Sequence, residues 1–210
     1  MKQQGLAMHN YAEVYREQFP VGWIGELEDG EIHGDEGEGW GFGAQLLPFM
    51  EQKNLFDSID MDQQVGHTSN AAAVETVITD FLCPSDGYAS GDVVNPGQEG
   101  GGNTEDEPDK TPGANPYSRS NYPGVFGNAH IEGGHDHGTA AAAMMSGDDD
   151  ELEANAGNGI FFAGLAGSGR SNNAVRFNMV TDGLSKTVAI GERDSRIGVS
   201  LWQGRVDGLE

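Results

Sequence analysis

The first nineteen residues are predicted to form an amphipathic helix. At about 100° per residue, one side of this helix collects apolar side chains, namely Ala7, Met8, Tyr11, Val14, Tyr15 and Phe19. The other side collects polar ones, namely Lys2, His9, Glu13, Arg16 and Glu17. Such a stripe packs against a core, and Pro20 and Gly22 are expected to end the helix. No capping residue marks its start, so we expect a longer helix that continues upstream of Met1.

Composition indicates one domain with a modest core and long loops. Only 36% of the 210 residues are hydrophobic, and 33 are glycine. Apolar runs still recur along the chain, so a single folded domain over residues 1–210 is expected. Residues 88–118 and 128–157 lack periodicity and are rich in glycine and acidic residues. We predict that both are long surface loops.

The charge balance excludes one class of partner. The chain has 34 acidic and 11 basic residues, which gives a net charge of -23. A surface of this kind repels phosphate backbones, so no nucleic-acid partner is expected. It also disfavours anionic membrane surfaces, whereas it suits divalent cations or a salty medium.

The middle of the chain is predicted to be helical. Residues 40–60 are dense in apolar side chains, and Pro48 suits the first turn of a helix. The side chains expected to face inward there are Phe49, Met50, Leu55, Phe56 and Ile59. Residues 71–81 are predicted as a further helix that Ser69 or Asn70 caps. Its apolar face consists of Val74, Val77, Ile78 and Phe81.

The end of the chain is predicted to be β-structure. Short apolar or β-branched runs occur at residues 159–162, 174–177, 187–191 and 199–202, which is typical of strands. Residues 120–127 are a further candidate, with Pro123 at a sheet edge. The glycine-rich residues 164–170 are expected to join the first two runs as a hairpin. Helices first and strands last predict an α+β fold, in which the N-terminal helix packs on a small antiparallel sheet.

Several segments, taken in order, resemble one known family. They are LAMHNYAEVYREQFP, GWGFGAQLLPFMEQKNLF, FLCPSD, SNYPGVFG, GNGIFF and VRFNMVTDGLSKTVAIGER, followed by Trp-Gln-Gly at residues 202–204. Together they resemble the domain-of-unknown-function family DUF fifteen-fifty-nine. This pilin-like family is abundant in planctomycetes and was formerly labelled a bacterial solute-binding type. The resemblance covers both ends of the chain and spares the two long loops.

The resemblance implies a pilin-like head with a prepilin-type leader and a longer apolar helix upstream of Met1. It implies export to the periplasm or cell surface, with other pilin-like subunits or the type II secretion machinery as partners. No apolar run here reaches the about 20 residues of a transmembrane helix, so membrane anchoring is expected only through that upstream helix. Members commonly carry a cysteine just upstream of the position of Lys2, which implies a disulfide partner for Cys83.

Two clusters of possible metal ligands lie in the second long loop. Imidazole and carboxylate groups that suit zinc gather at His130, His135 and His137, with Glu132 and Asp136 beside them. Hard oxygen ligands that suit calcium follow at Asp148, Asp150, Glu151 and Glu153. We expect calcium before zinc, although Leu152 breaks the EF-hand pattern. A weaker calcium candidate is the set Asp57, Asp60 and Asp62. The alternative for the histidine cluster is a glycine-flexible surface loop with accidental histidines. For the acidic residues it is a solvated helix turn or a solvated acidic surface.

Catalysis has little support in the sequence. No Gly-x-Ser-x-Gly elbow is present, and Cys83 before Pro84 is interpreted as a buried thiol or half of a disulfide. Asp182 and Glu192 are an acid–base pair only in principle. Aromatic side chains at Trp23, Trp40, Tyr88, Tyr117 and Trp202 offer a sugar-stacking platform, but the apolar neighbours of Trp40 and Trp202 favour the core.

Three functions therefore stand in order. The first is a structural, non-enzymatic subunit of a cell-envelope or secretion-associated assembly, which is exported, pilin-like and stabilised by calcium. The second is an extracytoplasmic module that binds a solute or carbohydrate. The third is a metal-dependent enzyme that uses His130, His135 and His137.

Overall fold

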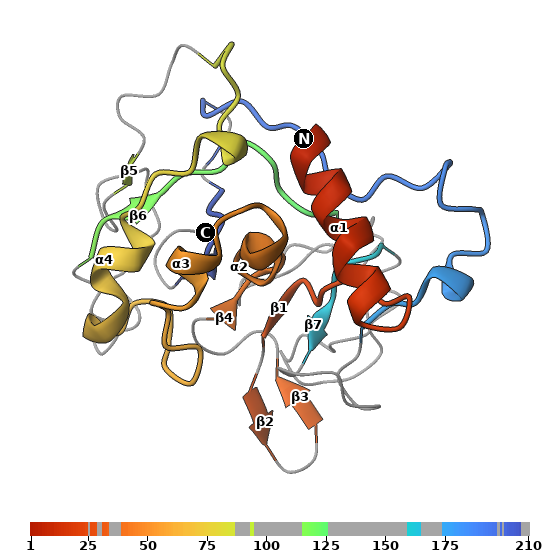
Figure 1. Cartoon of the computed structure of the whole chain (residues 1–210), viewed down its shortest axis with the longest axis horizontal. Helices are drawn as coiled ribbons and strands as arrows, with labels where there is room; N and C mark the ends of the chain where they lie inside the picture. Colours follow the sequence, from red (N-terminus) through yellow and green to blue (C-terminus); the bar gives the residue numbers. More distant parts are fainter. Residues whose placement is uncertain are drawn as a thin grey trace, which may run out of the picture.

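The computed structural model describes residues 1–24, 26–28, 31–33, 39–86, 93–94, 115–125, 159–164, 174–196, 198 and 200–206. Within them, short helices and two-stranded sheets surround one core, which confirms the predicted α+β class (Figure 1). The two metal-ligand clusters, His130 to His137 and Asp148 to Glu153, lie outside the described residues. None of the described helices is long and apolar enough to cross a membrane.

The N-terminal helix is shorter than predicted. Helix α1 covers Lys2–Val14 and buries Gln4, Ala7, Met8 and Ala12. Arg16 and Glu17 then take left-handed conformations, with φ of 58° and 60°. This turn lets the amide of Phe19 donate a hydrogen bond to the carbonyl of Val175 at 2.8 Å. Phe19 is buried as expected, but Val14 is 64% exposed, so its place on the buried face was wrong.

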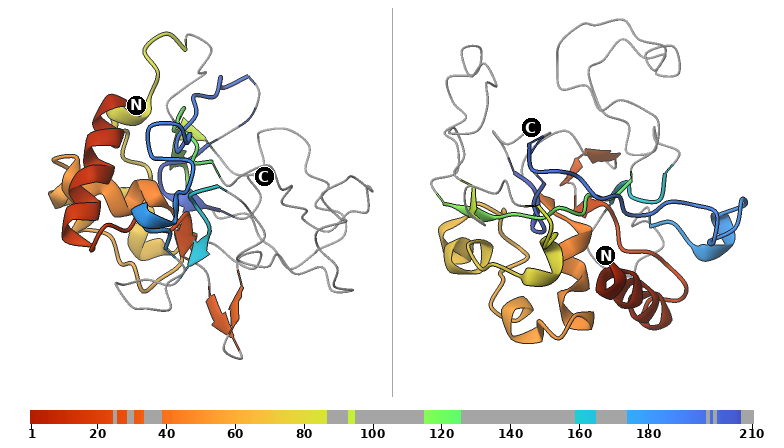
Figure 2. Two further views of the ribbon diagram at one scale, coloured as in Figure 1. Left: turned by 90° about the vertical axis from the view of Figure 1, so that its right-hand side faces the viewer. Right: turned by 90° about the horizontal axis from the view of Figure 1, so that it is seen from above.

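The helical part forms one side of the molecule, beside α1 (Figures 1 and 2). It consists of α2 (Phe42–Leu46), the 3-10 helix η1 (Leu47–Phe49) and α3 (Lys53–Phe56). Pro48 lies in the first turn of η1, as predicted. Met50 is buried, and Phe49, Leu55, Phe56 and Ile59 are partly buried against the core. Helix α1 packs chiefly against α2 and η1.

The predicted helix over residues 71–81 is broken in the middle. The segment consists of η2 (Thr68–Asn70), α4 (Ala71–Val74) and η3 (Thr79–Phe81). Residues 76–79 are all β-branched, and such residues lose side-chain freedom in a helix. Ile78 is accordingly extended, with φ of -112° and ψ of 109°. Val77 is 38% exposed instead of facing the core, whereas Val74, Ile78 and Phe81 are buried as predicted.

The strands are very short. The antiparallel pairs are β2 (Glu26–Glu28) with β3 (Glu31–His33), β4 (Gly39–Trp40) with β8 (Gly204–Arg205), and β5 (Val93–Val94) with β6 (Tyr117–Ser118). A parallel pair joins β1 (Trp23–Ile24) to β7 (Ala163–Gly164). A last 3-10 helix, η4, covers Phe177–Met179.

The C-terminal strands differ from the prediction. Residues 159–162 and 174–177 were expected to pair with each other as a hairpin. Instead, β7 pairs with β1, and Arg176 forms a bridge with Gln18, so both runs pair with the start of the chain. The runs at 187–191 and 199–202 contribute single bridges, Gly124 with Ile190 and Arg119 with Leu201. The predicted strand at 120–127 is reduced, within the described residues, to the bridge at Gly124, and the two-residue strand β6 lies just before it.

The core is built on aromatic and glycine residues. Trp40 and Trp202 are each 2% exposed, which confirms that both belong to the core. The Trp202 ring stacks on Phe81 at a centroid distance of 6.3 Å. A Cβ added at Gly43 would lie 2.3 Å from the carbonyl oxygen of Trp202. Only glycine therefore lets α2 approach the backbone of Trp202 this closely. Gly204 in β8 has a φ of 135°, which residues with a side chain rarely adopt, so glycine is required there as well.

Candidate functional site

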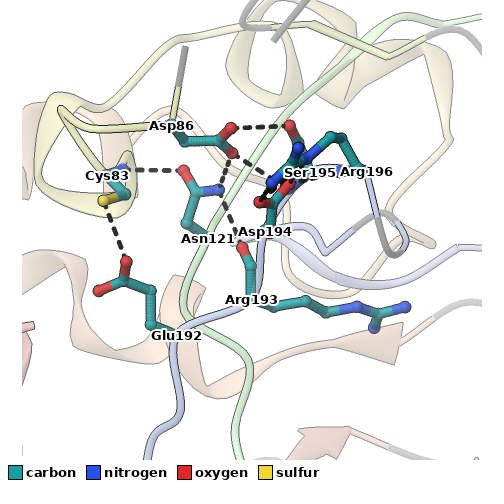
Figure 3. Close-up of polar contacts among 8 residues, drawn as sticks. All are labelled: Cys83, Asp86, Asn121, Glu192, Arg193, Asp194, Ser195 and Arg196. Carbon is teal, nitrogen blue, oxygen red and sulfur yellow. Dashed lines mark hydrogen bonds and ion pairs between the residues drawn. The ribbon is translucent and has the colours of Figure 1, made fainter. Parts of the chain in front are cut away.

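Three segments that are far apart in the sequence meet at a polar cluster, which we call the clamp (Figure 3). They are residues 83–86, Asn121, and residues 192–196. The first segment follows η3, where Pro84 stops further helix and the amide of Asp86 closes a turn on the carbonyl of Cys83 at 3.0 Å. The turn therefore spans residues 83–86.

Asn121 is the centre of the clamp. Its side-chain carbonyl accepts a hydrogen bond from the amide of Cys83 at 2.8 Å. Its side-chain NH₂ donates to Asp86 Oδ2 at 2.6 Å and to the carbonyl of Arg193 at 3.1 Å. Asn121 is only 7% exposed. Because these contacts satisfy a buried amide on both sides, the side chain fixes the relative positions of all three segments.

Asp86 ties the third segment to the first. Its carboxylate accepts hydrogen bonds from the amide of Ser195 at 3.1 Å and from the Ser195 hydroxyl at 3.0 Å. Next to this contact, Arg196 Nε donates to Asp194 Oδ1 at 2.9 Å. These hydrogen bonds lower the pKa of the Asp194 carboxyl to about 2. The third segment is thus held by the Asp86 carboxylate and carries the ion pair of Asp194 with Arg196 beside that contact.

The thiol of Cys83 lies on the other side of the clamp. Its Sγ atom contacts Glu192 Oε1 at 3.1 Å and Ser85 Oγ at 3.2 Å. Burial raises the pKa of the neighbouring Tyr122 phenol, and Cys83 and Glu192 add to this rise. The thiol is half-buried, so the predicted buried thiol is confirmed only in part. Within the described residues, its contacts are hydroxyls and a carboxylate, not the cationic groups that activate a nucleophile.

The clamp was not predicted from the sequence, although Cys83 and Glu192 were each named there as candidates. Asp86 and Ser195 are common turn residues, and nothing in their spacing links them to Asn121. The one available signal was the resemblance, because Cys83 and Asp86 lie in FLCPSD, Asn121 in SNYPGVFG, and Glu192 at the end of the last long motif. Three of the resembling segments therefore meet at a single place.

The remaining candidates are distributed as follows. Glu192 contacts Cys83, whereas Asp182 lies in an exposed turn before Gly183, so they belong to different places. Asp57 pairs with Lys53 at 2.6 Å, and Asp60 Oδ1 accepts from the amide of Asp62. Across the part of the chain that the structure describes, no three histidine, cysteine or acidic side chains gather as a metal site. The weaker calcium candidate at Asp57, Asp60 and Asp62 was therefore wrong.

The aromatic platform does not form as a surface. Trp40, Tyr117 and Trp202 are at most 2% exposed, so three of the five proposed stacking residues are core. Trp23 is half-buried, and Tyr88 lies outside the described residues. A sugar-stacking face built from these five residues is therefore excluded.

The fold and the clamp together define an α+β protein in which one polar cluster cross-links three distant segments. A protein-family model described as "Protein of unknown function (DUF1559)" matches residues 1–208, and the chain belongs to this family. The match confirms the family resemblance of the sequence. No curated protein and no solved structure matches the chain significantly.

Proposed function

We propose that this chain is the globular head of an exported, pilin-like structural subunit of a cell-envelope or secretion-associated assembly. In its full-length form the protein is anchored through an apolar helix upstream of α1, and its partners are other pilin-like subunits or secretion machinery. The head lies outside the cytoplasm. The proposal deepens the DUF1559 membership, which by itself names no activity.

The observation that carries the proposal is the position of α1. This helix precedes the rest of the fold and packs on it by one side only, through Gln4, Ala7, Met8 and Ala12. Gln4 also donates from Nε2 to the carbonyl of Asp80 at 3.1 Å. This hydrogen bond joins α1 to a part of the head that lies far away in the sequence. A helix attached in this way holds any upstream continuation in a fixed direction relative to the head.

The chemistry of the clamp supports a structural function over an enzymatic one. Its side chains satisfy one another through Asn121 and Asp86, and the contacts of the Cys83 thiol with Glu192 and Ser85 belong to the same cross-link. Such contacts stabilise the positions of chain segments. The acidic composition adds a reason for export, because calcium and salt outside the cell reduce self-repulsion at a net charge of -23.

The decisive experiment is N-terminal mass spectrometry of the mature protein from its native host. A cleaved and methylated N-terminus ahead of an apolar helix is expected. Ordinary signal-peptidase cleavage, or an unprocessed start, contradicts the pilin-like subunit and favours solute binding instead.

Calcium is proposed as the stabilising ion, through the acidic residues Asp148, Asp150, Glu151 and Glu153. Thermal melting with calcium, zinc or chelator tests this, because a ligand that binds only the folded state raises the melting temperature. A rise with calcium alone is expected. A response to low zinc concentrations instead favours the metal-dependent enzyme that uses His130, His135 and His137.

A further inference from the structure

The exposed apolar side chains of the described residues are unevenly distributed. Seven large hydrophobic residues are exposed, and six of them lie in residues 1–14 or 174–190. The most exposed are Val14 at 64%, Val188 at 63% and Met179 at 61%, and Leu6 is 56% exposed. The seventh, Val77, lies elsewhere at 38%. Scattered single residues of this kind need no explanation, but their gathering on two segments does.

These two segments lie side by side. Gln18 forms a bridge with Arg176, and the amide of Phe177 donates to the carbonyl of Glu17 at 2.9 Å. The His9 ring meets the Phe177 ring edge-on at 5.9 Å. Figures 1 and 2 both place the residues of η4 next to α1. We call the exposed side chains of residues 1–18 and 174–190 the α1–η4 face.

Within this face, Leu6 and Met179 come from neighbouring elements. Leu6 and His9 are three positions apart and therefore lie on the same side of α1. His9 contacts Phe177, and Met179 is in the same turn of 3-10 helix as Phe177. Val14 is five positions from His9, which is about 140° round the helix, so it lies at the edge of the face that is far from η4.

The α1–η4 face is also nearly neutral. Its basic side chains are Lys2, Arg16, Arg176 and Lys186, and its acidic ones are Glu13, Glu17 and Asp182, all of them exposed. The net charge of -23 therefore resides on the rest of the chain. Two copies that meet through strongly acidic surfaces repel each other. Two copies that meet through this nearly neutral face avoid most of that electrostatic repulsion.

We propose that two copies of this chain associate through the α1–η4 face about a two-fold axis. A two-fold contact needs a surface that complements itself. This face provides apolar side chains together with charges of both signs, so cations of one copy can meet carboxylates of the other. An anionic membrane is a poorer occupant, because the strongly acidic molecule behind this face would be repelled by it. The inference concerns the head alone and does not rest on the export proposed above.

Sedimentation velocity on the 210-residue chain tests the proposal, over protein concentrations up to roughly 1 mM. We expect a concentration-dependent dimer that becomes stronger from about 0.05 to 0.5 M salt, because salt screens the repulsion between the acidic surfaces. Leu6→Glu is expected to weaken dimerisation by about tenfold or more, since it removes apolar area and adds a like charge to both copies. Val77→Glu adds the same charge off the face and should leave dimerisation unchanged.

Met179→Glu provides an independent change on the second segment and should act like Leu6→Glu. Circular dichroism checks that each variant is folded. A monomer at every concentration and salt level overturns the proposal, as does equal weakening by Val77→Glu. Flotation with phosphatidylserine vesicles that Leu6→Glu abolishes, in a chain that stays monomeric, would assign the face to a membrane instead. None of these outcomes depends on how the native N-terminus is processed.

Discussion

The side-chain amide of Asn121 donates a hydrogen bond to the carboxylate of Asp86 across 2.6 Å. This contact bridges 35 positions of the sequence. Shortly before β6, Asn115 Nδ2 donates to the carbonyl of Gly66 at 2.9 Å. Side-chain amides thus fix the chain at Asp86 and at Asn115, and β5 between them pairs with β6. The predicted surface loop over residues 88–118 therefore contributes strand structure at both of these places.

Asn121→Ala is therefore expected to destabilise the fold by about 1–3 kcal/mol, because it leaves the amide of Cys83 without its acceptor and removes one donor from the Asp86 carboxylate, which keeps its contacts with Ser195. Urea unfolding measures this change. Asn178→Ala, on the exposed surface of η4, should stay within about 0.5 kcal/mol of the parent chain. Equal effects of the two variants would show that the clamp does not stabilise the fold.

A pair of glycines gives opposite predictions for the same substitution. Gly5 lies inside α1, and a Cβ there would meet nothing within 4 Å. Gly5→Ala should stabilise the chain by about 0.5–1 kcal/mol, because alanine loses less backbone entropy in a helix. Gly43→Ala should destabilise it, because its Cβ would clash with the carbonyl of Trp202. Thermal melting of both variants tests the packing of the two helices, and a loss of stability in Gly5→Ala would contradict the open surroundings of Gly5.

Because the helix ends after α4, two adjacent residues are expected to contribute very differently to stability. Ile78 is 4% exposed and Val77 is 38% exposed. Ile78→Ala should cost about 2–5 kcal/mol of stability, whereas Val77→Ala should change it by about 0.5 kcal/mol or less. Urea unfolding of each variant makes the comparison. Similar losses of stability for both variants would instead support the continuous helix predicted over residues 71–81.

The sequence predicted what local periodicity determines. The apolar stripe of α1, the first turn at Pro48 and the burial of Trp40 and Trp202 all follow from neighbours within a few residues. It failed where distant segments compete. Val14 was assigned to the core, but the chain turns at Arg16 so that Gln18 can pair with Arg176. A pairing between residues so far apart leaves no local periodic signal.

The strands and the clamp were hard to predict for the same reason. Strands of two residues are too short to show alternation, and the parallel pair of β1 with β7 unites segments at opposite ends of the chain. Asp86, Asn121 and Ser195 look like ordinary turn residues until tertiary contacts bring them together. The resemblance located the motifs of Asp86 and Asn121 without indicating that they touch, and its last long motif ends before Ser195.

The ion pair of Asp194 with Arg196 predicts a pH dependence at the edge of the clamp. Hydrogen bonds from Arg196 lower the pKa of Asp194 from 3.8 to about 2 in the folded chain. The folded state therefore favours the ionised carboxyl, and the stabilisation is complete above the unfolded pKa of 3.8. It is lost as the pH falls through about 2. Because the pair is exposed, its contribution is small and weakens with salt.

Asp194→Asn should consequently be less stable than the parent chain at neutral pH, and the difference should shrink as the pH falls from about 4 to 2. Urea unfolding at a series of pH values measures it. Asp182→Asn removes an exposed carboxyl from another turn and serves as the matched control. A difference for Asp194→Asn that stays constant down to the lowest pH would mean that the substitution perturbs the turn at Ser195, not the charge. In that case, the stabilisation comes from the Ser195 contacts with Asp86 alone.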